Sequence, residues 1–452
     1  MPREERVTSL KKSPVVIPGT ALNPKLVIKH GIRSVGMLFC AFALLAGLLD
    51  TPITTAFADV RDTDAINGIQ LSEFTGSHDA PDIQADYAGI CSKDGSLLWE
   101  RDADIQVPMA SITKIMTALV ALDSAELDTP ITVSNIAAEL GGSTAELQAG
   151  EIVDLHTLLY GLLIPSGNDA ATAIAEGIAG NEAAFVEKMN QKAAELGLRS
   201  TAFSNVSGIE DVDNYTTVSD CLQLTRIAMT DQVFRQIVGV PEATVTIDGV
   251  DVTYESTNLL FEEFEGAIGV KTGFTDAAGY CLVASAQRNG IELYSVVLNC
   301  DSDVSRVSDS VALLEWGFQH YRPIELVNSA KPVGQMALKD WLDKTVEVHA
   351  ANPVSVQLFD YDGDVSQEVS LNDWEGSVAK GESVGSIVWA QNGEVVATTE
   401  LVSAESVAAP DFFQWLNITW SRFWGGFSGS QTVASTKVYL GESFQIPAPV
   451  AG

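Results

Sequence analysis

The sequence predicts an α+β domain built on an antiparallel sheet, followed by a small all-β sandwich domain. Three observations support this fold class. Strand-like segments occur at both ends of residues 84–322, a helical region rich in Ala, Leu and Glu lies between them, and short Val-rich runs follow Pro323. Strands at both ends of a helical middle indicate that the two ends meet in one sheet, and they argue against a βαβ repeat.

Residues 1–58 are typical of an export signal. A basic stretch that includes Lys25 and Arg33 precedes the apolar run 35–49, and an Ala-Phe-Ala cleavage site ends at Ala58. The apolar run is short for a transmembrane helix, but the basic region before it is longer than usual, so an uncleaved anchor stays the alternative. Both interpretations place the rest of the chain on the outer side of the membrane.

Residues 59–83 are rich in Asp, Gly, Ser and Thr without periodicity, which predicts a linker. The first folded domain, 84–322, contains two predicted hairpins, one near each end. Asp-Gly at 94–95 and Asn-Gly at 289–290 each separate two strand-like segments. The predicted strands of this domain are 87–92, 97–100, 279–287 and 291–299. Helices are predicted from Ser111 and over 153–164, 169–179, 182–196 and 304–321.

The second domain, 323–403, is predicted as a sandwich whose strands include 345–349, 354–359, 383–389 and 395–399. Residues 404–427 follow, and in their segment 411–427 seven large apolar side chains fall within an arc of about 120° of a helix, namely Phe412, Phe413, Leu416, Trp420, Phe423, Trp424 and Phe427. One interpretation is an interfacial helix that lies on a membrane, and the other is a helix that packs on its own domain. Arg422 is the only cation in this segment, and residues 428–452 form a C-terminal tail.

Composition excludes some classes of function. The formal net charge of −34 makes the chain a poor nucleic-acid binder. The cysteines outside the signal are Cys91, Cys221, Cys281 and Cys300, whose pairing the sequence leaves open. None of them has zinc-ligand spacing to another cysteine or to histidines, so we expect no metal.

Three short motifs predict chemistry because they occur together. They are Ser111-Ile112-Thr113-Lys114, Ser166-Gly167-Asn168 and Lys271-Thr272-Gly273. Each alone is weak evidence, since a four-residue pattern arises by chance in many chains.

Ser111 and Lys114 are predicted to be a nucleophile and its base. Residues three apart on a helix lie on the same face, one turn from each other. Burial and the positive end of the helix dipole disfavour an ammonium group and so lower the pKa of Lys114. A neutral lysine accepts the proton of a serine hydroxyl, and none of the histidines suggests a Ser-His-Asp arrangement.

The second and third motifs contribute polar groups around this pair. Ser166 is suited to relay a proton to a leaving amine, and Asn168 to bond Lys114 and a substrate amide. The alternative is that Asn168 or Asp169 only caps the following helix. The Lys271-Thr272-Gly273 motif at a strand edge suits an extended peptide that ends in a carboxylate.

The motifs and the longer blocks around them resemble the low-molecular-mass penicillin-binding proteins, specifically the serine D-alanyl-D-alanine carboxypeptidases. The resemblance covers roughly residues 84–427 and includes PMASITKIMTALVAL, LLYGLLIPSGNDAATAIAE and GVKTGFTDAAGYCLVASA. It implies a β-lactamase/transpeptidase-like catalytic domain, a β-sandwich and a membrane-associating helix. It also implies hydrolysis of the terminal D-alanine of peptidoglycan stem pentapeptides, through a serine acyl-enzyme without metal or organic cofactor, and binding of β-lactam antibiotics.

The resemblance also implies a role for each matched residue. Ser111 is the nucleophile, Lys114 its base, and Ser166 with Asn168 completes the proton network. Lys271 and Thr272, beside Gly273, hold the terminal carboxylate, and the backbone N–H groups of Ser111 and Phe274 form the oxyanion hole.

Arg306 matches an arginine that contacts the substrate carboxylate in relatives, and its alternative is an ion pair on a surface helix. The chain departs from the family at Asn205-Val206-Ser207-Gly208, where many relatives carry Asn-Pro-His-Gly.

Three alternatives to the carboxypeptidase stay open. A D,D-endopeptidase that cuts peptidoglycan cross-links uses the same groups. A class A β-lactamase needs a Glu in an E-x-x-L-N loop after the second motif, and here Glu368-Val369-Ser370-Leu371-Asn372 lies too late, in the predicted sandwich. An inactive wall-binding or sensory protein with the same fold conflicts with retention of the catalytic residue types.

Overall fold

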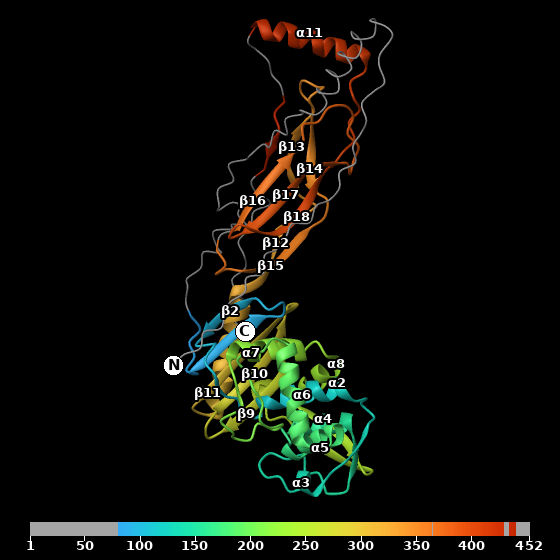
Figure 1. The fold of residues 1–452 in the computed structure, drawn as a ribbon. Helices are drawn as coiled ribbons and strands as arrows, with labels where there is room; N and C mark the ends of the chain where they lie inside the picture. Colours follow the sequence, from blue (N-terminus) through green and yellow to red (C-terminus); the bar gives the residue numbers. More distant parts are fainter. Residues whose placement is uncertain (1–79, 364, 429–433, 440–452) are drawn as a thin grey trace, which may run out of the picture. The chain divides into compact units, whose positions relative to one another are not determined.

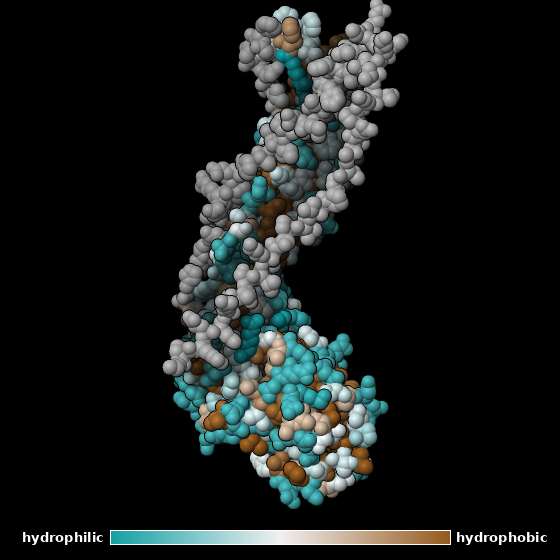
Figure 2. Space-filling model, viewed as in Figure 1, coloured by the Kyte–Doolittle hydropathy of each residue, from teal (hydrophilic) through white to brown (hydrophobic). Residues whose placement is uncertain are grey.

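The computed structural model describes residues 80–363, 365–428 and 434–439. The predicted signal 1–58, nearly all of the linker and most of the tail lie outside these residues. Within them, the architecture is an α+β domain and a β-rich domain, which confirms the predicted fold class (Figure 1). On the face of the α+β domain seen in Figure 2, hydrophilic residues are interspersed with hydrophobic ones.

The α+β domain is built on a five-stranded antiparallel sheet in the order β2-β1-β11-β10-β9. Its strands are β1 (Tyr87–Ser92), β2 (Leu97–Arg101), β9 (Ala267–Thr275), β10 (Gly279–Arg288) and β11 (Ile291–Cys300). Because β1 pairs with β11, strands from the two ends of the domain lie side by side, as predicted. Strand β9, which carries Lys271-Thr272-Gly273, forms one edge of this sheet.

Helices cover both faces of the sheet. Gly89 of β1 faces α7 (Val218–Ala228), where an added Cβ would lie 2.8 Å from a Val218 methyl carbon. The next residue, Ile90, points the other way and packs against Gly317 of α10 (Asp303–His320). Successive strand residues alternate between faces, so α7 and α10 lie on opposite sides, each over its own hydrophobic core.

The helical middle of the domain packs on the α7 side. It comprises the 3₁₀ helix η2 (Ala110–Thr113), α2 (Lys114–Ser124), α3 (Asn135–Ala138), α4 (Leu155–Leu163), α5 (Asn168–Ala179), α6 (Glu182–Glu195) and α8 (Gln232–Val238), whereas α9 (Leu260–Glu263) packs on the α10 side. Short ribbons β3 (Val107–Pro108) with β6 (Tyr215–Thr216), β4 (Pro130–Thr132) with β5 (Ile152–Asp154), and β7 (Glu242–Ile247) with β8 (Val250–Glu255) connect them.

Two helices begin more than one residue away from their predicted starts. The helix expected from Ser111 opens as a 3₁₀ turn, and α-helix begins only at Lys114. The helix expected over 153–164 begins at Leu155, because Asp154 accepts a hydrogen bond from the backbone N–H of Thr157 and caps the helix there. The four cysteines outside the signal are free and buried in the structure, and burial raises the pKa of Cys281 to about 11.

The β-rich domain consists of two sheets that share one core. Strands β12 (Tyr321–Val327) and β15 (Val354–Phe359) form one sheet, and the other has the order β16-β17-β18-β14-β13-β19. The members of the second sheet are β13 (Pro332–Ala337), β14 (Thr345–Ala350), β16 (Val365–Leu371), β17 (Ser383–Gln391), β18 (Glu394–Ser403) and β19 (Lys437–Val438). Glu368 lies in β16, which places the E-x-x-L-N string in the β-rich domain as predicted.

The last described helix, α11 (Phe412–Ser428), contacts the β-rich domain through few side chains. Ile418 is buried in the core of that domain, and Arg422 donates hydrogen bonds to the carbonyl oxygens of Lys339 and Trp341. The other large apolar side chains of residues 412–425 are exposed. None of the helices in the described part of the chain combines the length and apolar character needed to cross a bilayer.

We expect Trp389→Ala to destabilise the β-rich domain strongly. Trp389 is fully buried in the core of that domain, and replacing such a side chain costs about 3–5 kcal/mol of unfolding free energy. Urea unfolding of the full chain, followed by circular dichroism, measures the change. Val395→Ala is the control, because Val395 is exposed and its loss changes stability by about 0.5 kcal/mol or less. Equal effects of the two substitutions would contradict this packing.

Candidate active site

The turn that presents Ser111 is held in a strained conformation by close backbone contacts. Ala110 has a φ of +48°, a region that costs a non-glycine residue about 1 kcal/mol or more. A Cβ on Gly208 would lie 1.9 Å from the Ala110 carbonyl oxygen, and a Cβ on Gly273 would lie 3.2 Å from the Ser111 nitrogen. Two glycines therefore allow a loop and the edge strand β9 to approach the nucleophile turn.

Lys114 lies fully buried beneath Ser111, with oxygen atoms around its amine. The Nζ atom lies 2.9 Å from Ser111 Oγ, 2.8 Å from Asn168 Oδ1 and 2.8 Å from the Ser207 carbonyl oxygen. The predicted contacts of Lys114 with Ser111 and Asn168 are thus present. Burial, and then the positive charge of Lys271, lower the pKa of Lys114 well below its usual value, while the Asp169 carboxylate acts in the opposite direction.

The turn 166–168 connects the buried helices α4 and α5. Ser166 has a φ of +66°, and its Oγ accepts a hydrogen bond of 2.8 Å from Lys271 Nζ. The backbone N–H of Asn168 donates to the Ser143 carbonyl, and its side-chain Nδ2 donates to the Gly141 carbonyl. The alternative that Asn168 only caps α5 is wrong, because its side chain bonds Lys114 and residue 141 and no helix N–H.

Lys271 and Thr272 of β9 complete this polar cluster. Lys271 Nζ also donates to the Thr272 carbonyl at 2.9 Å, and the hydroxyl groups of Thr272 and Thr257 lie 2.6 Å apart. Burial and the Arg306 charge lower the pKa of Lys271 to about 7. Near neutral pH this amine therefore changes charge readily, and an arriving carboxylate favours its ammonium form.

Phe274 and Arg306 both lie next to Gly273. Phe274 follows it on β9, and Arg306 reaches its carbonyl oxygen from α10. The Phe274 ring is 48% exposed and lies 4.3 Å from the Tyr280 ring, centroid to centroid. Arg306 is buried, donates to the carbonyl oxygens of Gly273 and Cys281, and pairs with Asp303 one turn earlier on α10. The ion-pair alternative is therefore present, but only its Asp303 side is partly exposed, while Arg306 itself is buried against β9.

Sequence reasoning missed the contribution of residues 205–208. Asn205 Oδ1 accepts hydrogen bonds from the backbone N–H groups of Ser207 and Gly208, which directs the Ser207 carbonyl toward Lys114. Any residue type supplies a carbonyl, so only Gly208, with a φ of +83°, left a signal in the sequence.

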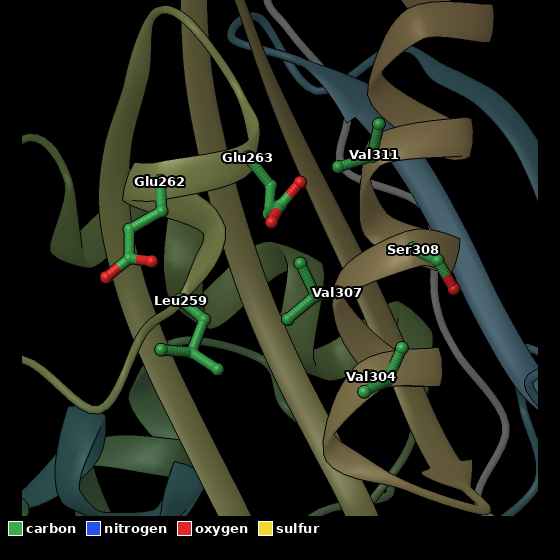
Figure 3. A pocket seen from close by; sticks show the side chains of 7 residues that line it. All are labelled: Leu259, Glu262, Glu263, Val304, Val307, Ser308 and Val311. Carbon is green, nitrogen blue, oxygen red and sulfur yellow. The ribbon is translucent and has the colours of Figure 1, made fainter.

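A separate pocket of about 360 Å³ lies between α9 and α10 (Figure 3). Leu259, Val304, Val307 and Val311 supply its apolar wall, and Glu262, Glu263 and Ser308 its polar groups. None of these residues belongs to the three motifs. The polar cluster of Ser111, Lys114, Ser166, Asn168 and Lys271 is thus a distinct site, suited to nucleophilic attack on a carbonyl next to a carboxylate.

The chain is similar to known peptidases. A family model described as D-alanyl-D-alanine carboxypeptidase matches residues 75–302. The D-alanyl-D-alanine carboxypeptidase DacF of Bacillus subtilis is 30% identical over 73% of this chain and 88% of its own length. Among solved structures, the Streptomyces K15 DD-transpeptidase has 34% identity and a TM-score of 0.52 over 53% of this chain and 99% of its own. The D-alanyl-D-alanine carboxypeptidase DacD of Francisella tularensis has 26% identity and a TM-score of 0.54 over 74% and 98%.

Lys271→Met tests the electrostatics of the site through stability. Between about pH 7 and pH 10.5 the unfolded chain binds a proton on Lys271 that the folded chain does not, so wild-type stability rises with pH relative to the variant. We expect the variant's advantage in unfolding free energy to shrink by about 1.4 kcal/mol per pH unit across this window. Below about pH 7 the difference is constant.

Urea unfolding of both proteins at several pH values measures this difference, in which the contributions of titrating groups that Lys271 does not influence cancel. The hydrogen bonds lost with the amine add a term that does not depend on pH. A difference that stays constant from pH 7 to pH 10 would contradict a depressed pKa of Lys271.

Proposed function

Because this chain belongs to the D-alanyl-D-alanine carboxypeptidase family, we propose that Ser111, Lys114, Ser166 and Asn168 carry out its reaction. The chain is a serine-type D,D-carboxypeptidase that acts on peptidoglycan peptides ending in D-Ala-D-Ala, and it binds penicillin. The observation that supports these roles is the continuous contact from Ser111 Oγ through Lys114 Nζ to Asn168 Oδ1, with distances of 2.9 and 2.8 Å.

The surroundings of Lys114 direct its lone pair. A neutral amine has two hydrogens and one lone pair, and the Asn168 and Ser207 oxygens are acceptors only. If the two hydrogens bond these oxygens, the lone pair is left for the third neighbour, the hydroxyl of Ser111. Lys114 then takes the Ser111 proton as Oγ attacks the carbonyl carbon of the penultimate D-alanine.

Ser166 and Lys271 serve the leaving group. As the C–N bond breaks, the D-alanine nitrogen needs a proton, and we assign its delivery to the Ser166 hydroxyl, which takes up in turn the proton that Lys114 received from Ser111 and so leaves Lys114 neutral for the second half of the reaction. Lys271, 2.8 Å from Ser166 Oγ, orients this hydroxyl and keeps its own charge for the substrate. The charge of Lys271 with the hydroxyl of Thr272 binds the terminal carboxylate, and Arg306 supports them through Gly273.

The second half of the reaction hydrolyses the acyl-enzyme and regenerates the free enzyme. The N–H groups of Ser111 and Phe274 stabilise the oxyanion in both halves. Water deprotonated by Lys114 attacks the acyl carbon, the bond to Ser111 Oγ breaks, and the shortened stem peptide leaves. Removing terminal D-alanine from donor peptides limits cross-linking of the wall.

Intact-mass spectrometry of the purified protein after benzylpenicillin tests these roles. We expect one stable adduct on wild type and none on Ser111→Ala, and a fall in D-alanine release from a diacyl-D-Ala-D-Ala peptide of roughly 10⁴-fold or more. Ser308→Ala is the control, because Ser308 lies outside the motifs on α10 and should leave both readings unchanged. An adduct on Ser111→Ala would overturn the assignment of the nucleophile. Rapid turnover of penicillin would favour a β-lactamase, and release of cross-linked peptides an endopeptidase.

We further propose that the protein is exported and that α11 lies on the outer surface of the cell membrane. The export signal at 1–58 supports the first part. For the second part, seven large side chains of α11 are between 50% and 78% exposed, namely Phe412, Phe413, Trp415, Leu416, Trp420, Phe423 and Trp424. Phe and Trp favour the boundary between lipid headgroups and acyl chains, and among helix residues 412–425, whose burial the structure describes, Ile418 alone is buried in the protein.

Vesicle flotation tests the membrane proposal. Replacing Trp420 and Phe423 by Ala removes two exposed rings, each worth roughly 1.5–3 kcal/mol when buried in lipid, so binding to phospholipid vesicles should fall by roughly 100-fold or more. Val250→Ala and Val395→Ala together form the control, because both residues are exposed but lie outside α11. Equal flotation of the two double variants would contradict the proposal.

A further inference from the structure

Asp169 is a buried carboxylate next to the catalytic turn that the reaction described above does not use. It is 1% exposed and is the second residue of α5. Its Oδ1 accepts hydrogen bonds from the backbone N–H groups of Ala145 (2.8 Å) and Ala170 (2.9 Å). Its Oδ2 accepts from Thr144 Oγ1 (2.6 Å) and the backbone N–H of Leu147 (3.1 Å). Most of these donors belong to one segment, residues 144–147.

The residues just before that segment hold Asn168. The Ser143 carbonyl accepts the backbone N–H of Asn168 at 2.8 Å, and the Gly141 carbonyl accepts its side-chain Nδ2 at 2.9 Å. A Cβ on Gly142 would lie 2.9 Å from Nδ2, so the segment passes directly against the amide. Residues 141–147 thus connect the Asp169 carboxylate to the Asn168 amide.

The orientation of this amide decides whether Lys114 can act as a base. With Nδ2 bonded to residue 141, the amide presents Oδ1 to Lys114 and takes up one N–H of the neutral amine. A rotated amide would present an N–H group instead, which would engage the lone pair of Lys114. Ser111 would then lose the acceptor for its proton.

We propose that Asp169 is a positioning residue for acylation, whose carboxylate fixes residues 141–147 so that the Asn168 amide presents only its oxygen to Lys114. This inference rests on the proposed roles of Ser111 and Lys114. It also gives the glycine of the Ser-Gly-Asn motif a reason, because a Cβ on Gly167 would lie 2.6 Å from Asp169 Oδ1.

The carboxylate has a second, electrostatic effect on the same base. The charged and titratable groups that face this cluster include Lys114 from α2, Lys271 from β9 and Tyr254 from β8, whose hydroxyl donates to the Ala145 carbonyl. The carboxylates of Glu146 and Glu151 also act on Tyr254, more weakly than Asp169. Burial and the Asp169 charge raise the pKa of Tyr254 to about 12, so it stays protonated in the working range. Asp169 opposes the lowering of the Lys114 pKa, and removing its charge lowers that pKa further.

Stopped-flow acylation of the full chain by benzylpenicillin from pH 5 to pH 10 tests the inference on Asp169→Asn and Thr144→Val. An amide at 169 places an N–H₂ group against backbone N–H donors and breaks the clamp, so we expect the plateau rate to fall roughly 10²-fold. The acid limb of the profile should also move to lower pH, because a negative charge is lost. Thr144→Val removes the hydrogen bond to Asp169 and the one that Thr144 Oγ1 accepts from the backbone N–H of Glu146, but no charge, so its rate should fall severalfold with the acid limb unmoved.

The outcomes separate this inference from the proposed function. If wild type is not acylated, or if Ser111→Ala is, the proposed function fails. If wild type is acylated normally and folded Asp169→Asn keeps its plateau within about twofold and its acid limb in place, the positioning role is overturned. Should Asp169→Asn fail to fold, an unchanged acylation rate in Thr144→Val overturns it, whereas a severalfold fall supports it.

Discussion

A lysine amine in a fully buried position is the constraint on which the rest of the site depends. A buried ammonium group without a carboxylate in direct contact is costly, so burial lowers the pKa of Lys114 well below its usual value and favours the neutral amine that the proposed reaction uses as its base. Three oxygen atoms surround it, and only the Ser111 hydroxyl among them also carries a proton to give. The spacing of three residues brings Lys114 next to Ser111. Because the other two neighbouring oxygens of Lys114 only accept hydrogen bonds, its lone pair is directed toward the Ser111 hydroxyl.

The neighbours of Lys114 come from separate parts of the chain, and backbone strain and glycine bring them together. Ala110 and Ser166 both adopt positive φ values beside the catalytic groups, and Gly208 and Gly273 leave room for a loop and a strand against the nucleophile turn. The core on the α7 side of the sheet offsets the free-energy cost of these strained conformations, since α2, α4 and α5 contribute buried side chains to it. Residues 141–147 add a layer behind Asn168 that Asp169 ties down.

The α+β domain and the helix α11 differ in the residues that they expose. The α+β domain mixes hydrophilic and hydrophobic residues on the face seen in Figure 2, in keeping with the acidic composition of the chain. The β-rich domain has its own core, and α11, with most of its large apolar side chains exposed, is joined to it through Ile418 and Arg422. The exposed apolar side chains of α11 are the observation on which the proposed membrane contact of this helix rests.

The sequence by itself determined the features that depend on residues close together in the chain. Turn signals at 94–95 and 289–290 located two hairpins, apolar periodicity located α5, α6 and α10, and the three motifs identified the reactive side chains. Only the tertiary structure decided the 3₁₀ turn at Ser111, the carbonyl of Ser207 at Lys114, the buried place of Arg306 and the link from Asp169 to Asn168. These features use backbone atoms that every residue shares and contacts between distant parts of the chain, so no local pattern of residue types encodes them.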